Sequence, residues 1–99
     1  MATEILVALQ VTDNELYDRY RAEMYPILQE YGGSFGYDFK VAEVLKSETQ
    51  EPLNRVFTIR FQNKDNIDSF FKNTEYLAIK KLYFTPAVTT VVEIANYEK

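Results

Sequence analysis

Four polar side chains stand in surroundings that are otherwise apolar or aromatic, and they are the candidate ligand-binding residues: Tyr20, Asp38, Arg60 and Tyr76. Arg60 interrupts a strand-like run and lies on the face opposite Phe57 and Phe61. A guanidinium in that place could hold the carboxylate of a ligand. The alternative is an ion pair with a carboxylate of a neighbouring strand, such as Asp38, Glu43 or Glu93. The sequence assigns no catalytic residue.

Asp38 lies between Tyr37 and Phe39, where a strand would normally carry an apolar residue. A desolvated carboxyl there would have a raised pKa and could abstract a proton. The alternative is a solvated or ion-paired carboxylate, or a bulge position. Tyr20 and Tyr76 are expected on helix faces that meet the sheet, where a hydroxyl can donate to a carbonyl oxygen or act as a weak acid. The alternative for both is core packing with one satisfied hydroxyl.

The chain contains no histidine and no cysteine. These absences exclude imidazole bases, His-containing triads, haem held by histidine, thiol chemistry and nearly all catalytic zinc sites. Gly32-Gly33 lacks the spacing of a phosphate loop, and the acidic segment 48–51 lacks that of a calcium loop. We therefore expect neither a metal nor a cofactor.

The formal net charge is −4, and Lys80-Lys81 is the largest basic cluster. Phosphate contacts need a patch of Lys and Arg, so neither nucleic acid nor an anionic membrane surface is an expected partner. The apolar run 5–9 is too short for a signal peptide, and no stretch approaches a membrane span. We expect a cytoplasmic protein with one domain over residues 1–99.

The first third of the chain predicts a strand and a helix. Residues 3–11 alternate as a strand, and Thr12 to Glu15 form a capping box with Thr12 as the helix cap. Pro26 predicts a kink or break near residues 22–26, and Gly32 predicts a left-handed stop. The buried stripe of this helix is Leu16, Tyr17, Tyr20, Met24, Ile27, Leu28 and Tyr31.

The remaining segments predict three strands and a second helix. Residues 34–46 read as a long strand with a bulge, 47–54 as a hairpin loop and 55–62 as a third strand. Asn63 caps the second helix, which is expected to divide at residues 73–74 and to end before Pro86. Its predicted buried stripe is Ile67, Phe70, Phe71, Thr74, Leu77 and Ala78. Residues 87–97, rich in β-branched side chains, predict the last strand.

This order of elements predicts an α+β domain of ferredoxin-like type, an antiparallel four-stranded sheet with both helices on one face. The other sheet face would carry Leu6, Ala8, Val56 and Thr58. Such a face is too apolar to stay in water, so we expect a homodimer that packs through the open sheet face.

The spacing of several residues resembles a known family. Tyr17, Tyr20 and Pro26 with Gly32-Gly33, the strand 55–61, and Phe70-Phe71 with Glu75-Tyr76 are similar to the small bacterial family called domain of unknown function 1330. This family is part of the dimeric α/β-barrel group, and the similarity covers roughly residues 4–95. The resemblance implies a dimeric α/β barrel and no established reaction.

The chain departs from the family pattern at three polar positions. Ser34 stands where a basic residue commonly follows the glycines, Arg60 where an acidic residue is common, and Tyr83 where an Arg is usual. The Gly that the family tends to carry in the loop after the second strand is also missing. A site that the family shares is therefore expected to be altered here.

Three functional hypotheses follow. The first is a dimeric module that binds a small acidic or aromatic molecule in a cleft between helices and sheet. The second is a cofactor-free enzyme of monooxygenase, isomerase or lyase type, as in other dimeric α/β-barrel families. The third is a structural or interaction dimer without a ligand. An enzyme should gather Asp38, Arg60 or Tyr76 around one cavity, whereas an interaction dimer should fill that space with rings.

Overall fold

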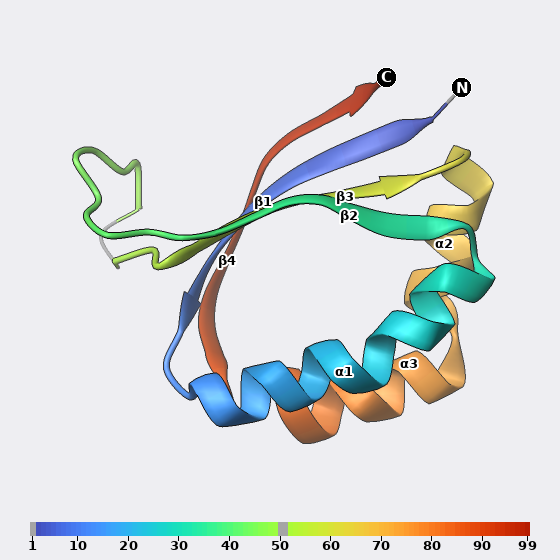
Figure 1. Cartoon of the computed structure of the whole chain (residues 1–99), viewed down its shortest axis with the longest axis horizontal. Coiled ribbons are helices and arrows are strands. Elements are labelled where there is room, and N and C mark those ends of the chain that lie inside the picture. Colours follow the sequence, from blue (N-terminus) through green and yellow to red (C-terminus); the bar gives the residue numbers. More distant parts are fainter. Residues whose placement is uncertain (1, 50–51) are drawn as a thin grey trace.

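The computed structural model describes residues 2–49 and 52–99. Its strands are β1 (Thr3–Val11), β2 (Gly33–Lys40), β3 (Arg55–Phe61) and β4 (Val88–Glu98), and they form one antiparallel sheet in the order β2-β3-β1-β4. The helices are α1 (Asn14–Glu30), α2 (Lys64–Lys72), α3 (Thr74–Ile79) and the π-helical turn η1 (Lys80–Phe84). All of them lie on one side of the sheet (Figure 1). This is the ferredoxin-like α+β arrangement that the sequence predicts.

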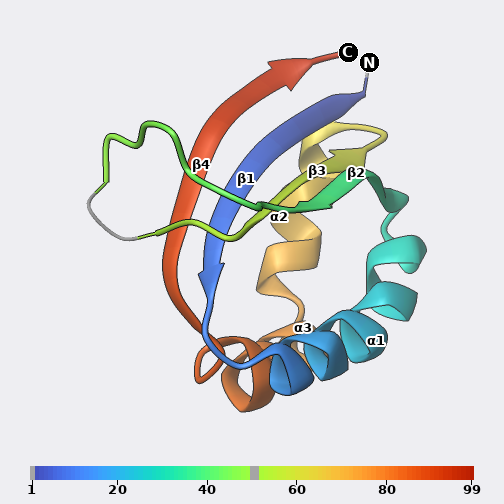
Figure 2. The same cartoon turned by 60° about the vertical axis from the view of Figure 1, so that its left-hand side comes forward.

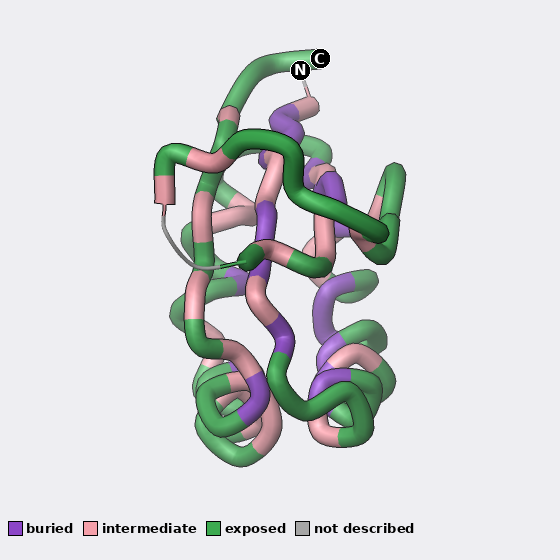
Figure 3. The backbone as a smooth tube through the Cα atoms, turned by 90° about the vertical axis from the view of Figure 1, so that its left-hand side faces the viewer, coloured by how far each residue is buried: buried purple, intermediate pink, exposed green. Residues whose placement is uncertain are grey.

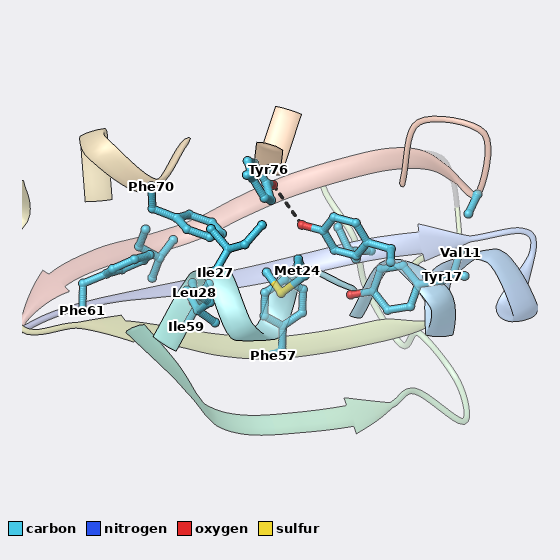
Figure 4. Close-up of a cluster of buried hydrophobic side chains, with 14 residues drawn as sticks. Val11, Tyr17, Met24, Ile27, Leu28, Phe57, Ile59, Phe61, Phe70 and Tyr76 are labelled. Carbon is cyan, nitrogen blue, oxygen red and sulfur yellow. Dashed lines mark hydrogen bonds between the residues drawn. The ribbon is translucent and has the colours of Figure 1, made fainter. Parts of the chain in front are cut away.

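Strand register decides which side chains face the helices. Ile5 pairs with Ile59 and Val7 with Phe57, so these residues share the helix-facing side of the sheet. Leu6 pairs with Thr58 on the opposite side, which we call the outer face. The core lies between the helix-facing side and the helices (Figure 4). Burial concentrates in β1 and along the inner sides of the helices, whereas much of β4 is exposed (Figure 3).

The cap of α1 is one residue later than predicted. Asp13 is the N-cap, and its Oδ1 accepts from the Leu16 backbone N–H at 3.1 Å. The Thr12 hydroxyl instead donates to the Ala87 carbonyl at 3.2 Å. Asp and Thr are both good caps, and the contact with Ala87 occupies Thr12. The capping-box prediction was therefore wrong in its register, and the helix begins one residue later than expected.

Pro26 does not break α1, which continues as one helix to Glu30. The path of the helix bends in its second half in both views (Figures 1 and 2). Gly32 has a φ of 72°, the left-handed conformation predicted for the helix stop. The chain then enters β2 directly.

β2 is shorter than the predicted strand 34–46 and ends at Lys40. A register shift between Phe35 and Asp38 marks the expected bulge. Beyond Lys40, the backbone bond from Val41 N–H to the Asn54 carbonyl at 2.9 Å closes the ladder. The segment after it leaves the sheet as a long loop (Figure 2), because β3 begins only at Arg55 and offers it no further partner.

The second helix divides where predicted, and the division changes which residues are buried. Asn73 ends α2 and caps α3 through a 2.9 Å bond from the Tyr76 N–H to its Oδ1. The break resets the helical phase, so Tyr76 is buried and Leu77 is exposed. The predicted stripe through Leu77 and Ala78 was therefore wrong, because it assumed one continuous helical period.

Candidate functional site

A cavity of about 310 Å³ lies between α1, the α3–η1 segment and the helix-facing side of the sheet. This volume is at the lower end of about 300–1,000 Å³, the common range of small-molecule sites. The apolar part of its wall is formed by Ile5, Val7, Leu9, Met24, Phe35, Phe57, Ile59, Phe71, Phe84 and Val91. The polar part is formed by Tyr17, Tyr20, Arg21, Tyr76, Lys80 and Glu93. The space between helices and sheet is thus not filled by rings.

Two tyrosines from different helices meet on this wall. The hydroxyls of Tyr20 and Tyr76 are 2.9 Å apart in a buried hydrogen bond, drawn as the dashed line at Tyr76 in Figure 4. The residues are 5% and 3% exposed. Burial raises the pKa of both hydroxyls, so both stay protonated near neutrality. One hydroxyl donates its proton in this hydrogen bond and the other accepts it. The O–H of the accepting hydroxyl is therefore left to donate to another acceptor.

η1 brings a cation to the same cavity. The Thr85 N–H donates to the Lys80 carbonyl at 2.9 Å, which closes a turn one residue wider than an α-helical turn. Lys80 and Phe84, at the ends of this turn, both line the cavity. The Lys80 ammonium lies 5.8 Å from the Phe84 ring centroid. The neighbouring Lys81 is exposed.

Asp38 lies beside the cavity rather than on its wall, between two arginines. Its carboxylate accepts from Arg55 Nε and Nη2 at 2.8 Å each, and from Arg21 Nη1 and Nη2 at 3.1 and 3.3 Å. The Arg55 hydrogen bonds, followed by the charge of Arg21, hold the pKa of Asp38 below its usual value. The carboxyl is therefore an ionised, saturated acceptor, which is the ion-paired alternative given for Asp38 and not the base of raised pKa.

Arg60 is on the outer face, away from the cavity. Its Nη2 lies 3.6 Å from Glu4 Oε1, and Glu4 is the residue opposite it in β1. Glu4 also accepts from the Tyr97 hydroxyl at 2.5 Å and lies 3.4 Å from the Lys99 ammonium. These contacts, led by Tyr97, lower the pKa of Glu4. The expected ion pair of Arg60 exists, but with Glu4 in place of Asp38, Glu43 or Glu93.

The structure thus brings together Tyr20 and Tyr76 and separates them from Arg60. Sequence reasoning missed Arg21, because Arg21 is not part of the buried stripe that the sequence predicts for this helix. Its signal was the spacing from Tyr17: residues four apart on a helix are neighbours, and Arg21 Nε donates to the Tyr17 hydroxyl at 2.8 Å. Within the described residues, no cluster of three or more acidic side chains is placed to hold a metal. No helix in the described part of the chain is long and apolar enough to cross a membrane.

A family model described as "Domain of unknown function (DUF1330)" matches residues 5–97. The chain belongs to this family. Membership agrees with the resemblance of the first helix, the third strand and the Glu75-Tyr76 segment. No curated protein matches the DUF1330 chain by sequence.

Solved structures similar to this DUF1330 protein share its fold at low identity. A protein of unknown function from Rhodopseudomonas palustris matches with a TM-score of 0.84 and 15% identity, over 99% of this chain and 82% of the other. A dimeric protein of unknown function with a ferredoxin-like fold from Bacteroides fragilis matches with a TM-score of 0.64 and 13% identity, over 99% and 96%. A hydroxynitrile lyase from Passiflora edulis matches with a TM-score of 0.63 and 17% identity, over 97% and 91%.

Proposed function

We propose that this DUF1330 protein is a homodimer that binds a small, largely apolar molecule with an acceptor oxygen in the cavity between helices and sheet. The observation that carries the proposal is the Tyr20–Tyr76 hydroxyl pair on the wall of an apolar cavity. A buried O–H without a second partner favours a ligand that supplies an oxygen, since an unsatisfied buried donor is costly. Rings of the ligand would pack on Phe57, Phe71 and Phe84.

The geometry favours binding over catalysis. Asp38 and Arg60, two of the three groups that an enzyme was expected to gather around one cavity, do not line it. Among the described residues, Glu93 is the only carboxylate on its wall, and Glu93 is exposed to solvent. The tyrosines have raised pKa values and can donate hydrogen bonds but are poor bases. A lyase-type function rests on fold likeness to the Passiflora edulis enzyme alone.

The ligand proposal is tested by thermal shift, because a ligand that binds the folded state raises Tm by mass action. The neutral probe is 3-phenylpropan-1-ol, which offers one ring and one oxygen. We expect it to raise the Tm of the wild-type protein and to raise that of the Tyr20→Phe/Tyr76→Phe double variant less. Tyr25→Phe, a change on the exposed side of α1, is the control and should respond as wild type. An equal response of the double variant would contradict the proposed site, and the absence of any shift with oxygen-bearing aromatic probes would contradict the proposed function.

The dimer proposal rests on the outer face of the sheet. Tyr37 and Phe39 are 61% and 57% exposed, and their rings stack with centroids 5.9 Å apart. Phe39 pairs with Val56, which places it on the outer face beside an apolar neighbour. An exposed aromatic surface of this kind is typical of an interface, and a two-fold dimer would cover it on both copies. The Bacteroides fragilis relative is described as dimeric.

Sedimentation equilibrium at micromolar concentration tests the dimer. We expect a wild-type dimer and a folded monomer for Phe39→Glu, since burying an unpaired charge in an apolar interface is costly. Leu82→Glu, an equally exposed site on η1, controls for the added charge and should remain dimeric. A monomeric wild-type protein would rule out the interface.

A further inference from the structure

We propose that the ligand of the cavity is a carboxylate with an apolar body, and that its carboxylate group binds at the guanidinium of Arg21 and the hydroxyl of Tyr17. This inference rests on the proposed function and assigns the chemical class of the ligand. It is carried by the hydrogen-bond donors, the charge and the packing at one end of the cavity, where Tyr17 and Arg21 both form part of the wall.

Arg21 and Tyr17 have more hydrogen-bond donors than the neighbouring side chains have free acceptors. Arg21 uses Nε for the Tyr17 hydroxyl and one N–H of each terminal nitrogen for Asp38. One N–H on each terminal nitrogen is left, and no other described residue accepts from it. Tyr17 is fully buried, and its hydroxyl accepts from Arg21 while its own proton has no acceptor among the described residues. A ligand carboxylate, which only accepts, matches this set of donors.

Asp38 cannot accept further hydrogen bonds from the remaining N–H groups of Arg21 or from the Tyr17 hydroxyl. A carboxylate has about four acceptor sites, and Asp38 already accepts four N–H bonds from Arg21 and Arg55. Two guanidinium groups share this single carboxylate, so the three side chains together carry one net positive charge. The other charged residues on the cavity wall, Lys80 and Glu93, have opposite signs. With Arg21, the charged residues that line the cavity therefore carry one net positive charge, which favours an anion, while Asp18 acts electrostatically on Arg55 outside the wall.

The guanidinium of Arg21 is held in place by aromatic rings. It lies 4.0 Å from the ring centroid of Phe35, 4.7 Å from that of Phe57 and 5.1 Å from that of Tyr17. The Arg21 side chain is 16% exposed. A charge that is fixed and partly desolvated interacts with a ligand anion more strongly than a mobile surface charge does. The same rings offer the apolar body of the ligand a surface next to its carboxylate.

Two probes with the same three-carbon phenyl skeleton measure this preference by titration calorimetry at pH 7.5: 3-phenylpropanoate and the neutral 3-phenylpropan-1-ol. We expect the wild-type protein to bind the carboxylate about tenfold or more tightly than the alcohol, as charge-assisted hydrogen bonds require. Equal affinity for the two probes would overturn the carboxylate inference while leaving the proposed function intact. Binding of neither probe would remove the proposed function itself.

Variants test whether the preference for the carboxylate over the alcohol depends on Arg21. Arg21→Met keeps the apolar stem and should reduce carboxylate affinity to that of the alcohol, with alcohol affinity unchanged. Lys81→Met removes the same charge from the adjacent, exposed position of η1, which does not line the cavity, and should retain the preference. A preference that survives in Arg21→Met, or that disappears in Lys81→Met, would overturn the assignment to Arg21.

Two milder variants keep the test valid if Arg21→Met does not fold. Tyr17→Phe should weaken carboxylate binding by about tenfold, because one donor is lost, and should leave alcohol binding unchanged. Asp38→Asn should strengthen carboxylate binding, because the counter-charge of the two arginines is removed. Weaker carboxylate binding in Asp38→Asn, or no change in Tyr17→Phe, would contradict the proposal.

Discussion

The hydroxyls of Tyr20 and Tyr76 are in hydrogen-bond contact although the two residues lie on different helices. Their rings meet edge to face with centroids 6.3 Å apart, and the ring of Tyr20 lies 4.9 Å from that of Phe84. The pair therefore joins α1 to the α3–η1 segment on the wall of the cavity. Its contribution to folding can be separated from its contribution to binding.

The two hydroxyls of the pair should contribute to stability in a coupled way, so the effects of removing them should not add. Tyr76→Phe leaves the buried Tyr20 hydroxyl without its partner, and we expect a loss of about 1–3 kcal/mol in the free energy of unfolding. The double variant Tyr20→Phe/Tyr76→Phe should cost less than the sum of the two single changes, because neither hydroxyl is then left alone. Urea unfolding with an unchanged m-value measures this coupling. Strict additivity would mean that the hydrogen bond does not form in solution.

Asp38 should make stability depend on pH at the acid end. Its folded pKa lies below the unfolded value of about 3.9, so the pairing with Arg21 and Arg55 stabilises the protein fully above about pH 4. This stabilisation is lost as the pH falls through the folded pKa, where the carboxyl becomes protonated. Asp38→Asn should therefore flatten the decline of Tm below pH 4 relative to wild type.

Glu4 also has a lowered pKa, so Asp38→Asn should leave part of the acid decline in place. Asp68→Asn, at an exposed position of α2, controls for the loss of one negative charge. The two variants are compared by thermal unfolding between pH 2.5 and pH 7, a range that spans the usual carboxyl pKa values of about 4. Parallel curves for wild type and Asp38→Asn would show that the two arginines do not hold Asp38 in solution.

Local patterns predicted most of the fold, and errors arose where a contact with a distant segment decided the local structure. Thr12 and Asp13 are both good helix caps, and only the distant carbonyl of Ala87 assigns Thr12 to another role. The end of β2 depends on where its partner β3 begins, and the alternation of residues 34–46 carries no information about that position. Both faults lie in contacts between segments that are remote in the chain.

The candidate site shows the same division between local and distant information. Alternation in β3 correctly placed Arg60 on the face opposite Phe57, but its partner Glu4 depends on the pairing of β1 with β3. Asp38 and its two arginines come from three different elements, so no spacing in the sequence reveals their association. The pairing of Tyr20 with Tyr76 required the packing of two helices, although each was a candidate by itself.

Gly32 should be required because of its left-handed backbone conformation and not because a Cβ would be crowded at this position. Its φ of 72° is unfavourable for residues with a Cβ, so Gly32→Ala should lower the free energy of unfolding by about 1–2 kcal/mol. A Cβ at this position would lie 3.3 Å from the flexible Gln62 side chain, which can move. Gly32→Asn should cost less, because Asn tolerates the left-handed region. Equal losses for Ala and Asn in urea unfolding would indicate crowding instead.

Asn73 should control both the stability of α3 and the position of Tyr76. Its Oδ1 caps the helix at the Tyr76 N–H, and its Nδ2 donates to the Tyr31 hydroxyl at 3.0 Å. We expect Asn73→Ala to cost about 1–2 kcal/mol, as for other lost caps, and to increase hydrogen exchange at the Tyr76 amide. Asn63→Ala is the matched control, because Asn63 caps α2 through the same type of bond but lies away from Tyr76. It should lower stability while leaving the exchange of the Tyr76 amide relative to global unfolding unchanged. If the two variants affected that amide equally, the cap at Asn73 would have no specific role in placing Tyr76 at the cavity.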